Sequence, residues 1–508
     1  MLRRVLLLGS LLASSNAVSL KHHGASEQGS SQLSETVSVG CHQACTQLSA
    51  TFGSAFHYPD NDQNFTIWDA KQQEVHPACR VEPSDANEVA RVLDILVHHW
   101  CNFAVKGGGH SRHRDDSNSV AGVTIDLDRI NNVEVSTDGT KARVGGGATT
   151  AKVYRDLDSH GLSFVGGRVG TVGVGGFTLG GGTSPFSNKY GLSLDNVFEY
   201  EVVLANGTIT TVSDYDHPDL YFALRGGGNN FGIVTAFTVR TFSQGPVFTA
   251  ATSYHNNQSE QVLDQVYDLW TGDELSSDVE TAYDFYYAYS PQNDDFTLMG
   301  NQRYAKPIMN PPVFSNINEI TPLTRSPRIA TMGNMTGSPE PMGVTRNLFA
   351  TLSVRPSRPF LTQALKIFSE EVKKIKSVKG LTPNFICYPI QKNAITAMKQ
   401  RGGNALGIDT DGPLFLILIS TAWTNASGDA AVNSMTENTV QRVKSAAEKL
   451  GVANRYRYIN YASAAQTDEV FPGYGGENMQ RLKQIQMAVD PKGVFTSKGL
   501  WRGFRKLL

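Results

Sequence analysis

The distribution of glycine limits what this chain can fold into more than any other feature of its sequence. Half of the 48 glycines lie between Cys101 and Gly232. The densest run is Gly166–Gly182, where glycine is too frequent for an ordinary helix or strand. This run predicts a long, ordered loop wrapped around another group. The glycine-rich part of the chain therefore predicts a domain whose backbone makes many unusual turns, which glycine allows.

A shorter glycine cluster carries the clearest chemical signal. Residues 101–105 are typical of a short buried strand, and Lys106–His110 follows them directly. Three glycines after a strand let the backbone approach a phosphate closely, with N–H groups pointing at it. His110 stands at the exit of this loop. A third cluster, Leu224–Thr235, leads into another strand.

Composition narrows the class of protein. The chain has 508 residues, of which 40% are hydrophobic, enough for two or three ordinary domains. The formal net charge of −2 provides no basic surface and disfavours nucleic acid as a partner. No segment approaches about 20 consecutive apolar residues, so we expect no membrane span or membrane partner. We expect a monomer without a metal site.

The N-terminus is typical of a secreted protein. Arg3 and Arg4 precede the apolar run Val5–Leu12, and small residues lead to a cleavage point after Ala17. We therefore predict a signal peptide over 1–17 and a polar, disordered segment over 18–38. Five sequons support secretion and predict N-glycosylation; their asparagines are Asn64, Asn206, Asn257, Asn334 and Asn425.

The five cysteines fit an oxidising compartment. Cys41, Cys45, Cys79 and Cys101 lie close to the start of the mature chain, which predicts one or two disulfides there. An odd number leaves at least one thiol unpaired, and Cys387 is the expected one. The pairing itself does not follow from the sequence.

Hydrophobic periodicity predicts an α+β organisation. Ser84 is expected to cap a helix that follows a short strand. A hairpin is expected through Ala205–Gly207. Beyond about residue 245 glycine becomes rarer, and strand-like runs alternate with helical stretches over 359–376 and 430–450. This pattern favours a second domain built as a sheet with helices on one face.

Four groups of motifs, in this order, resemble the berberine bridge enzyme-like family of FAD-linked oxidases, within the vanillyl-alcohol oxidase superfamily. They are Gly107–His110; Gly170–Gly176 with Gly180–Gly182 and Lys189–Asn196; Arg225–Thr235; and the C-terminal set Tyr458–Tyr461, Tyr474–Asn478 and Asp490–Phe495. The resemblance covers nearly the whole mature chain. It implies a two-lobed PCMH-type FAD-binding domain over 39–245, a substrate domain with an antiparallel sheet covered by helices over 246–450, and a segment over 451–508 that returns to the flavin.

The resemblance also implies how FAD is held. His110 would form a covalent bond to the flavin 8α-methyl group. Many members add a second link through a cysteine just before the Thr-Val-Gly run, where this chain has Val169, so a single histidyl link is expected. The remaining flavin contacts are expected from Gly107, Gly108, Gly109, Ser111, Gly170, Thr171, Gly175, Gly176, Gly181, Gly182, Ile233, Val234 and Asn460.

Catalysis by an FAD oxidase needs a protein base that takes a proton while the flavin accepts a hydride. Tyr458 and Asn460 alternate on an expected strand, which puts them on one face and Tyr461 on the other. Tyr458 is the candidate base or substrate orienter, and Asn460 is expected to hold the flavin ring. Tyr388 and Gln391 are further candidates on the substrate domain, with Asn404 and Asp409 as alternatives.

Together these features predict a secreted FAD oxidase that acts on an alcohol, an amine or a related carbon of a small molecule. Dioxygen would be the acceptor and hydrogen peroxide the product. Fungal relatives of this type often belong to secondary metabolism, so the resemblance favours a natural product as substrate. Two alternatives stay open: a dehydrogenase with another acceptor, and a flavin-loaded binding or defence protein without turnover.

Overall fold

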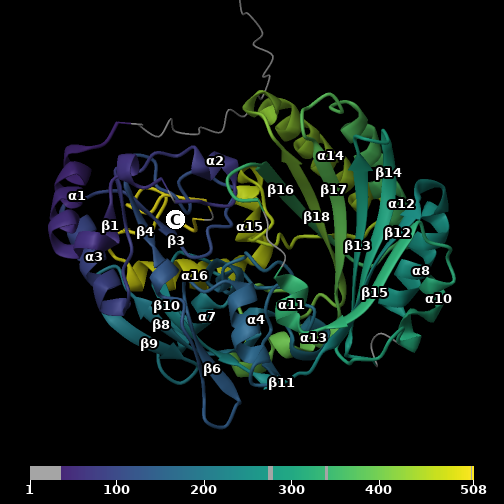
Figure 1. Ribbon diagram of the computed structural model, residues 1–508, viewed down its shortest axis with the longest axis horizontal. Coiled ribbons are helices and arrows are strands. Elements are labelled where there is room, and N and C mark those ends of the chain that lie inside the picture. The colour runs from purple at the N-terminus through teal and green to yellow at the C-terminus, as the bar shows by residue number, and fades with distance from the viewer. Residues whose placement is uncertain (1–35, 64, 273–277, 338–340, 505) are drawn as a thin grey trace, which may run out of the picture. The chain divides into compact units, whose positions relative to one another are not determined.

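The computed structural model describes residues 36–63, 65–272, 278–337, 341–504 and 506–508 (Figure 1). The predicted signal peptide, most of the 18–38 segment and the sequon asparagine Asn64 lie outside these residues. Within the described part of the chain, no helix is both long and apolar enough to cross a membrane. The other four sequon asparagines are exposed, as a glycan requires.

The first lobe is built on a four-stranded sheet with the order β1-β2-β4-β3. Its strands are β1 (Phe56–His57), β2 (Cys79–Val81), β3 (Phe103–Lys106) and β4 (Val123–Asp126), and its helices are α1 (Val39–Phe52), α2 (Ala70–Gln73) and α3 (Ala86–His98). Strands β2 and β3 both pair with β4 in parallel, so α3 is the crossover between them. The cap of α3 is Asp85, whose side chain accepts the Glu88 N–H, and the prediction of Ser84 was wrong by one residue.

Two disulfides fasten α1 to this lobe. Cys41 bonds to Cys101 and Cys45 bonds to Cys79, which confirms the predicted disulfides near the start of the mature chain. Cys387 is free and buried, also as predicted. The bridges join α1 to the first residue of β2 and to the segment that enters β3, and β3 leads directly into the first glycine loop.

The second lobe is a five-stranded antiparallel sheet with the order β5-β6-β10-β8-β9. Its strands are β5 (Val133–Val135), β6 (Lys141–Gly145), β8 (Val197–Val203), β9 (Ile209–Ser213) and β10 (Ile233–Arg240); around it lie α4 (Thr150–Asp158), α5 (Val174–Leu179), α6 (Ser187–Tyr190) and α7 (Pro218–Leu224), with the short pair β7 (Leu162–Ser163) and β11 (Phe242–Ser243). The predicted β8–β9 hairpin is confirmed. The glycine-dense run is not loop throughout, because α5 lies within it; burial of Val174 and Leu179 in the core outweighs the low helix propensity of its two glycines.

The third sheet has eight antiparallel strands in the order β15-β12-β14-β13-β17-β18-β16-β19. The strands are β12 (Val247–His255), β13 (Thr281–Ser290), β14 (Asp295–Tyr304), β15 (Thr324–Ala330), β16 (Arg346–Val354), β17 (Thr382–Ile390), β18 (Leu414–Trp423) and β19 (Ala453–Asn454). The helices α8 (Ser259–Thr271), α10 (Ser315–Asn318), α12 (Arg358–Lys373) and α14 (Asp429–Lys449) cover one face (Figure 1). This is the predicted antiparallel sheet with helices on one face.

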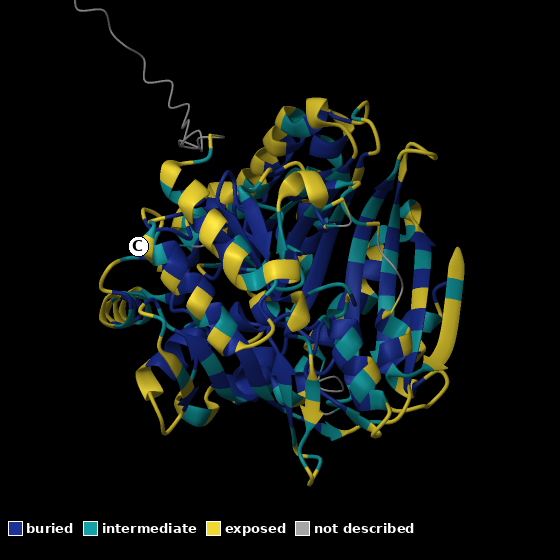
Figure 2. Cartoon of the chain, turned by 60° about the vertical axis from the view of Figure 1, so that its left-hand side comes forward, coloured by how far each residue is buried: buried dark blue, intermediate teal, exposed yellow. Residues whose placement is uncertain are grey.

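Strand periodicity divides the residues of this sheet between its two faces. On β13, Phe285 and Tyr287 pack among residues of the covering helices, so Asp284 and Tyr286 point to the opposite face. That opposite face meets the second lobe, because Asp284 pairs with Arg168. Buried residues concentrate in the strands and on the inward sides of the helices (Figure 2).

The C-terminal segment returns to the second lobe. It carries α15 (Thr467–Val470) and α16 (Gly476–Val489), while α11 (Met332–Thr336) and α13 (Lys392–Met398) lie in connections of the third sheet. The Tyr474 hydroxyl donates to the Gly226 carbonyl, and Gln486 donates to the Asn230 carbonyl. These bonds hold residues 456–461 beside the glycine-rich segments.

Candidate active site

Two of the glycine loops meet backbone to backbone. A Cβ atom on Gly108 would lie 2.3 Å from the Gly173 nitrogen, and one on Gly173 would lie 2.3 Å from the Gly108 nitrogen. Any side chain would therefore separate the loops. Gly109 has φ +68°, which adds a conformational reason for glycine there. The predicted segments 107–109 and 170–176 thus form one continuous surface.

His110 lies at the edge of this surface. Its Nε2 atom is 3.0 Å from the Thr171 Oγ1 atom, and its ring stacks on Trp68 at 3.9 Å between centroids, with 17° between the planes. Both contacts fix the direction of the imidazole, which stays partly exposed. The next residue, Ser111, is directed away, since its hydroxyl donates to Asp116 at 2.6 Å.

Of the remaining predicted flavin residues, one borders open space and the others are packed against the protein. Gly176 is exposed, and a Cβ atom there would meet nothing within 4 Å, so the backbone borders open space. Gly175 is packed against Gly146, whereas Gly170 is packed against Thr336. Ile233 and Val234 are buried in the core, so they can reach a cofactor only through their backbone. Open glycine backbone beside a fixed, partly exposed histidine fits a covalently attached dinucleotide.

Tyr458 is buried and held by three donors. Its hydroxyl oxygen accepts the Gly182 N–H at 2.9 Å, the Thr183 N–H at 3.3 Å and the Asn460 Nδ2 group at 3.1 Å. Burial raises the pKa of Tyr458 to about 12, although these hydrogen bonds lower it. Gly181 lets the backbone pass close to the Tyr458 ring, because a Cβ atom there would lie 2.9 Å from that ring.

The segment around Tyr458 is a turn, and the prediction of a strand was wrong. The N–H groups of Tyr461 and Ala462 both donate to the Tyr458 carbonyl. This turn brings the Tyr461 ring to 4.7 Å from the Tyr458 ring, where a regular strand would have placed it on the other face. Asn460 lies beside Tyr458 and against Gly180, and its side chain also donates to the Phe177 carbonyl.

Tyr461 is the phenol that joins the glycine loops to the third sheet. It is half-buried and lies 6.0 Å from Phe349 and 6.2 Å from Tyr388 between ring centroids. Burial raises its pKa, whereas Arg168 and a hydrogen bond with Thr183 lower it. Phe349 in turn lies 6.3 Å from Trp68, the residue that stacks on His110.

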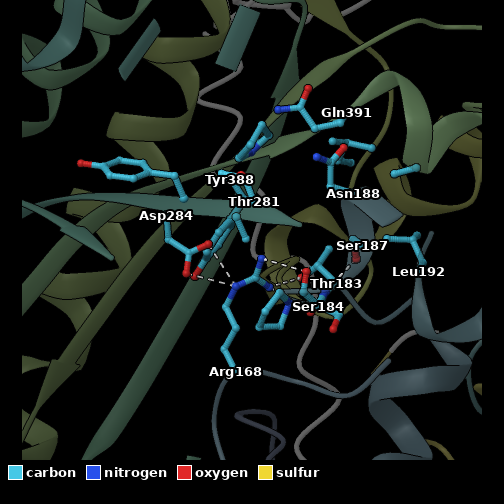
Figure 3. Close-up of a pocket in the computed structure, with 16 residues that line it drawn as sticks. Arg168, Thr183, Ser184, Ser187, Asn188, Leu192, Thr281, Asp284, Tyr388 and Gln391 are labelled. Carbon is cyan, nitrogen blue, oxygen red and sulfur yellow. Dashed lines mark hydrogen bonds and ion pairs between the residues drawn. The ribbon is translucent and has the colours of Figure 1, made fainter. Parts of the chain in front are cut away.

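Arg168 is the central cation of this site. Its Nε atom donates to both Asp284 oxygens at 3.0 and 3.1 Å, and its terminal nitrogens donate to the carbonyls of Thr183 and Ser184 (Figure 3). The guanidinium lies 4.7 Å from the Tyr388 ring centroid. Asp284 also pairs with Arg303 of β14. The pair therefore joins the second lobe to the third sheet directly beside Tyr461.

The predicted substrate-domain candidates have different surroundings. Tyr388 lies under Arg168, and burial holds its pKa well above the ordinary value. Gln391 lines a small cavity of about 30 Å³ together with Arg168 and Asn188 (Figure 3). The third candidate, Asn404, belongs to another network, where it donates to Asp195 beside Arg225. Asp409 forms no ion pair with any residue that the structure describes.

Sequence reasoning missed Arg168, Asp284 and Arg303. Arg168 directly precedes Val169, the position already singled out, and this adjacency was the available signal. Asp284 and Arg303 stand in alternating strands without a local motif. Their pairing follows from the register of β13 on β14, where Asp284 opposes Asn301 and Ala282 opposes Arg303.

Comparison with known proteins agrees with this geometry. An FAD binding domain family matches residues 77–213. The FAD-dependent monooxygenase tpcD of Cochliobolus heterostrophus is 32% identical over 486 residues, covering 90% of this chain and 93% of the relative. Two solved structures share the fold at 20% identity: glucooligosaccharide oxidase of Acremonium strictum, with a TM-score of 0.72, and wild-type BBE-like 1 of Physcomitrella patens, with a TM-score of 0.70. Each match covers 89% of this chain and 97% of the other.

The fold and the site define an FAD-dependent oxidoreductase. The similarity to tpcD extends over nearly the full length of both chains. The chain belongs to the berberine bridge enzyme-like family of FAD-linked oxidoreductases.

Proposed function

We propose that this protein is an oxidase that carries FAD on a single covalent bond to His110 and passes electrons to dioxygen, with hydrogen peroxide as product. The observation that carries the proposal is the placement of His110, fixed by Trp68 and Thr171 at the exit of the glycine loop. Glucooligosaccharide oxidase is described as holding a 6-S-cysteinyl, 8α-N1-histidyl FAD. Val169 supplies no sulfur for the first of those bonds, which supports a single link here.

Bound flavin would supply the hydride acceptor. The residues of the chain would supply the proton acceptor and the orientation of the substrate. Tyr461 fits the role of base better than Tyr458, because the Tyr458 oxygen already accepts three hydrogen bonds. Burial keeps the pKa of Tyr461 above its ordinary value although Arg168 lowers it, so in this proposal the phenol gives up its proton only with the further help of the electron-poor ring of bound flavin. Tyr458 and Asn460 would then hold the turn that carries Tyr461 in a fixed position relative to the flavin ring.

The substrate in this proposal is an alcohol, an amine or a related carbon of a small natural product. The aromatic residues Phe349, Tyr388 and Tyr461 favour a flat, partly apolar molecule. We further propose a secreted, N-glycosylated monomer. Two disulfides support an oxidising compartment, and the exposed sequon asparagines support glycosylation.

Three measurements test the proposal. Acid-precipitated protein should stay yellow, with flavin on the peptide that contains His110, whereas His110→Ala protein should release its flavin on denaturation. A panel of candidate substrates should be screened for anaerobic bleaching near 450 nm. With the substrate so found, one peroxide should form per product in air; incorporation of labelled oxygen into the product would instead indicate a monooxygenase, the activity for which tpcD is named.

A further inference from the structure

Buried charges around Asp284 do not balance. The Asp284 carboxylate is 1% exposed and pairs with two guanidiniums, Arg168 and Arg303, whose side chains are each 13% exposed. Two positive charges therefore share one negative charge, which leaves one positive charge in excess. A buried charge is normally paired, because removing it from water is costly. We therefore expect an anion to bind beside these two guanidiniums.

The nearby tyrosines do not supply that anion. Tyr286, Tyr388 and Tyr461 surround Arg168, and burial raises the pKa of all three above the ordinary value. They are therefore neutral at physiological pH. Among the described residues, the next carboxylate along β13 is Glu280, which already pairs with the exposed Lys189 and Lys306.

Arg303 is the cation with capacity for a further partner. The nitrogens of Arg168 donate to Asp284, Thr183 and Ser184. For Arg303, Asp284 is the one carboxylate partner in the described chain. A guanidinium has five donors in a planar fork, so one carboxylate contact leaves room for a second anion.

We propose that Arg303 binds the negatively charged end of the substrate, an ionised carboxylate, enol or phenol, on the flavin-facing side of β13 and β14. Asp284 orients the Arg303 guanidinium and is itself held by Arg168. The aromatic residues Tyr286, Tyr388 and Tyr461 border the same region and suit the rest of a flat substrate. This inference rests on the proposed function, since it names the substrate class of that site.

Ligand binding tests the inference without turnover. The flavin-loaded protein is titrated with benzoate, benzamide and benzyl alcohol, which share a ring and differ in charge. Binding is followed by calorimetry and by the change in the flavin absorption spectrum. We expect benzoate to bind about tenfold or more tightly than either neutral probe, and Arg303→Gln to remove most of that preference. Arg303→Lys should keep part of it.

Arg91→Gln is the matched control, because Arg91 is an exposed arginine on α3 of the first lobe and should leave benzoate affinity unchanged. Each variant is checked for flavin content and unfolding temperature. Equal affinity for benzoate and benzamide would overturn the inference, as would benzoate affinity unchanged in a folded Arg303→Gln protein. Calorimetry also separates the two proposals, because loss of covalent flavin with intact benzoate binding refutes only the proposed function.

Discussion

Loss of the hydroxyl group should mainly lower the stability at Tyr458, whereas at Tyr461 it should mainly lower the rate of flavin reduction. In Tyr458→Phe, the buried N–H groups of Gly182 and Thr183 lose their acceptor, while Asn460 keeps the Phe177 carbonyl. An unsatisfied buried donor costs about 1–3 kcal/mol, so the two together should lower the stability by roughly 2–6 kcal/mol. In Tyr461→Phe, the ring is half-buried and the loss should be at most about 1 kcal/mol.

The rate of flavin reduction should fall more in Tyr461→Phe than in Tyr458→Phe, the reverse of the order in lost stability. General base catalysis contributes about 10²–10⁴-fold, so Tyr461→Phe should slow anaerobic flavin reduction by that factor. Tyr458→Phe should keep the rate within about tenfold, provided that it folds and carries flavin. Thermal unfolding at a fixed scan rate gives the stability order, and stopped-flow absorbance near 450 nm gives the reduction rate with the substrate from the bleaching screen.

Tyr221→Phe is the control, since Tyr221 is a buried phenol that donates to a single carbonyl, Val197, away from the site. It should change neither rate nor flavin content. The reasoning is refuted if Tyr458→Phe unfolds at the temperature of the parent protein yet reduces its flavin 100-fold more slowly. Full activity of Tyr461→Phe would refute it equally.

Three further predictions use other parts of the chain. Val169→Cys should acquire flavin on the peptide containing residue 169 in addition to that of His110, seen by mass spectrometry after proteolysis; flavin on His110 alone would count against the assignment of this position. Replacing Cys41 and Cys101 by serine opens a link across 60 residues and should destabilise the protein by about 4 kcal/mol, measured by denaturant unfolding. Burial raises the pKa of Asp115 to about 6, so its protonation stabilises the folded state as pH falls from about 6 to about 4. Asp115→Asn should flatten the stability profile in that window by up to about 3 kcal/mol, and an unchanged profile would contradict this assignment.

The sequence predicted well those parts of the molecule that depend on local pattern. The β8–β9 hairpin followed from its Asn206–Gly207 turn, and the third sheet followed from strand and helix periodicity. The first glycine loop was predicted as a cofactor surface because three glycines directly after a strand let the backbone approach a phosphate closely. In each case a short stretch of chain contains the physical cause of the structure.

The errors occurred where tertiary contacts decide the local conformation. Alternation over Tyr458–Asn460 suggested a strand, but the backbone bonds from Tyr461 and Ala462 to the Tyr458 carbonyl make a turn. The helix α5 forms despite two adjacent glycines because its apolar residues are buried. Arg303 could not be found because its partner Asp284 lies on another strand, and only the register of the sheet brings them together.

The loop that contains residues 168 and 169 can be fixed in two ways, by a covalent bond to the flavin or by an ion pair with the third sheet. The family resemblance implies that relatives with a second cysteinyl link fix this loop to the flavin at the position that Val169 occupies here. In this chain the preceding residue, Arg168, fixes the loop to β13 through Asp284 and to Thr183 and Ser184 through its other nitrogens. Because this ion pair is buried, salt screens it little, so it can hold the loop without a covalent bond. Val169→Cys leaves Arg168 in place, and its effect therefore reports on the flavin link alone.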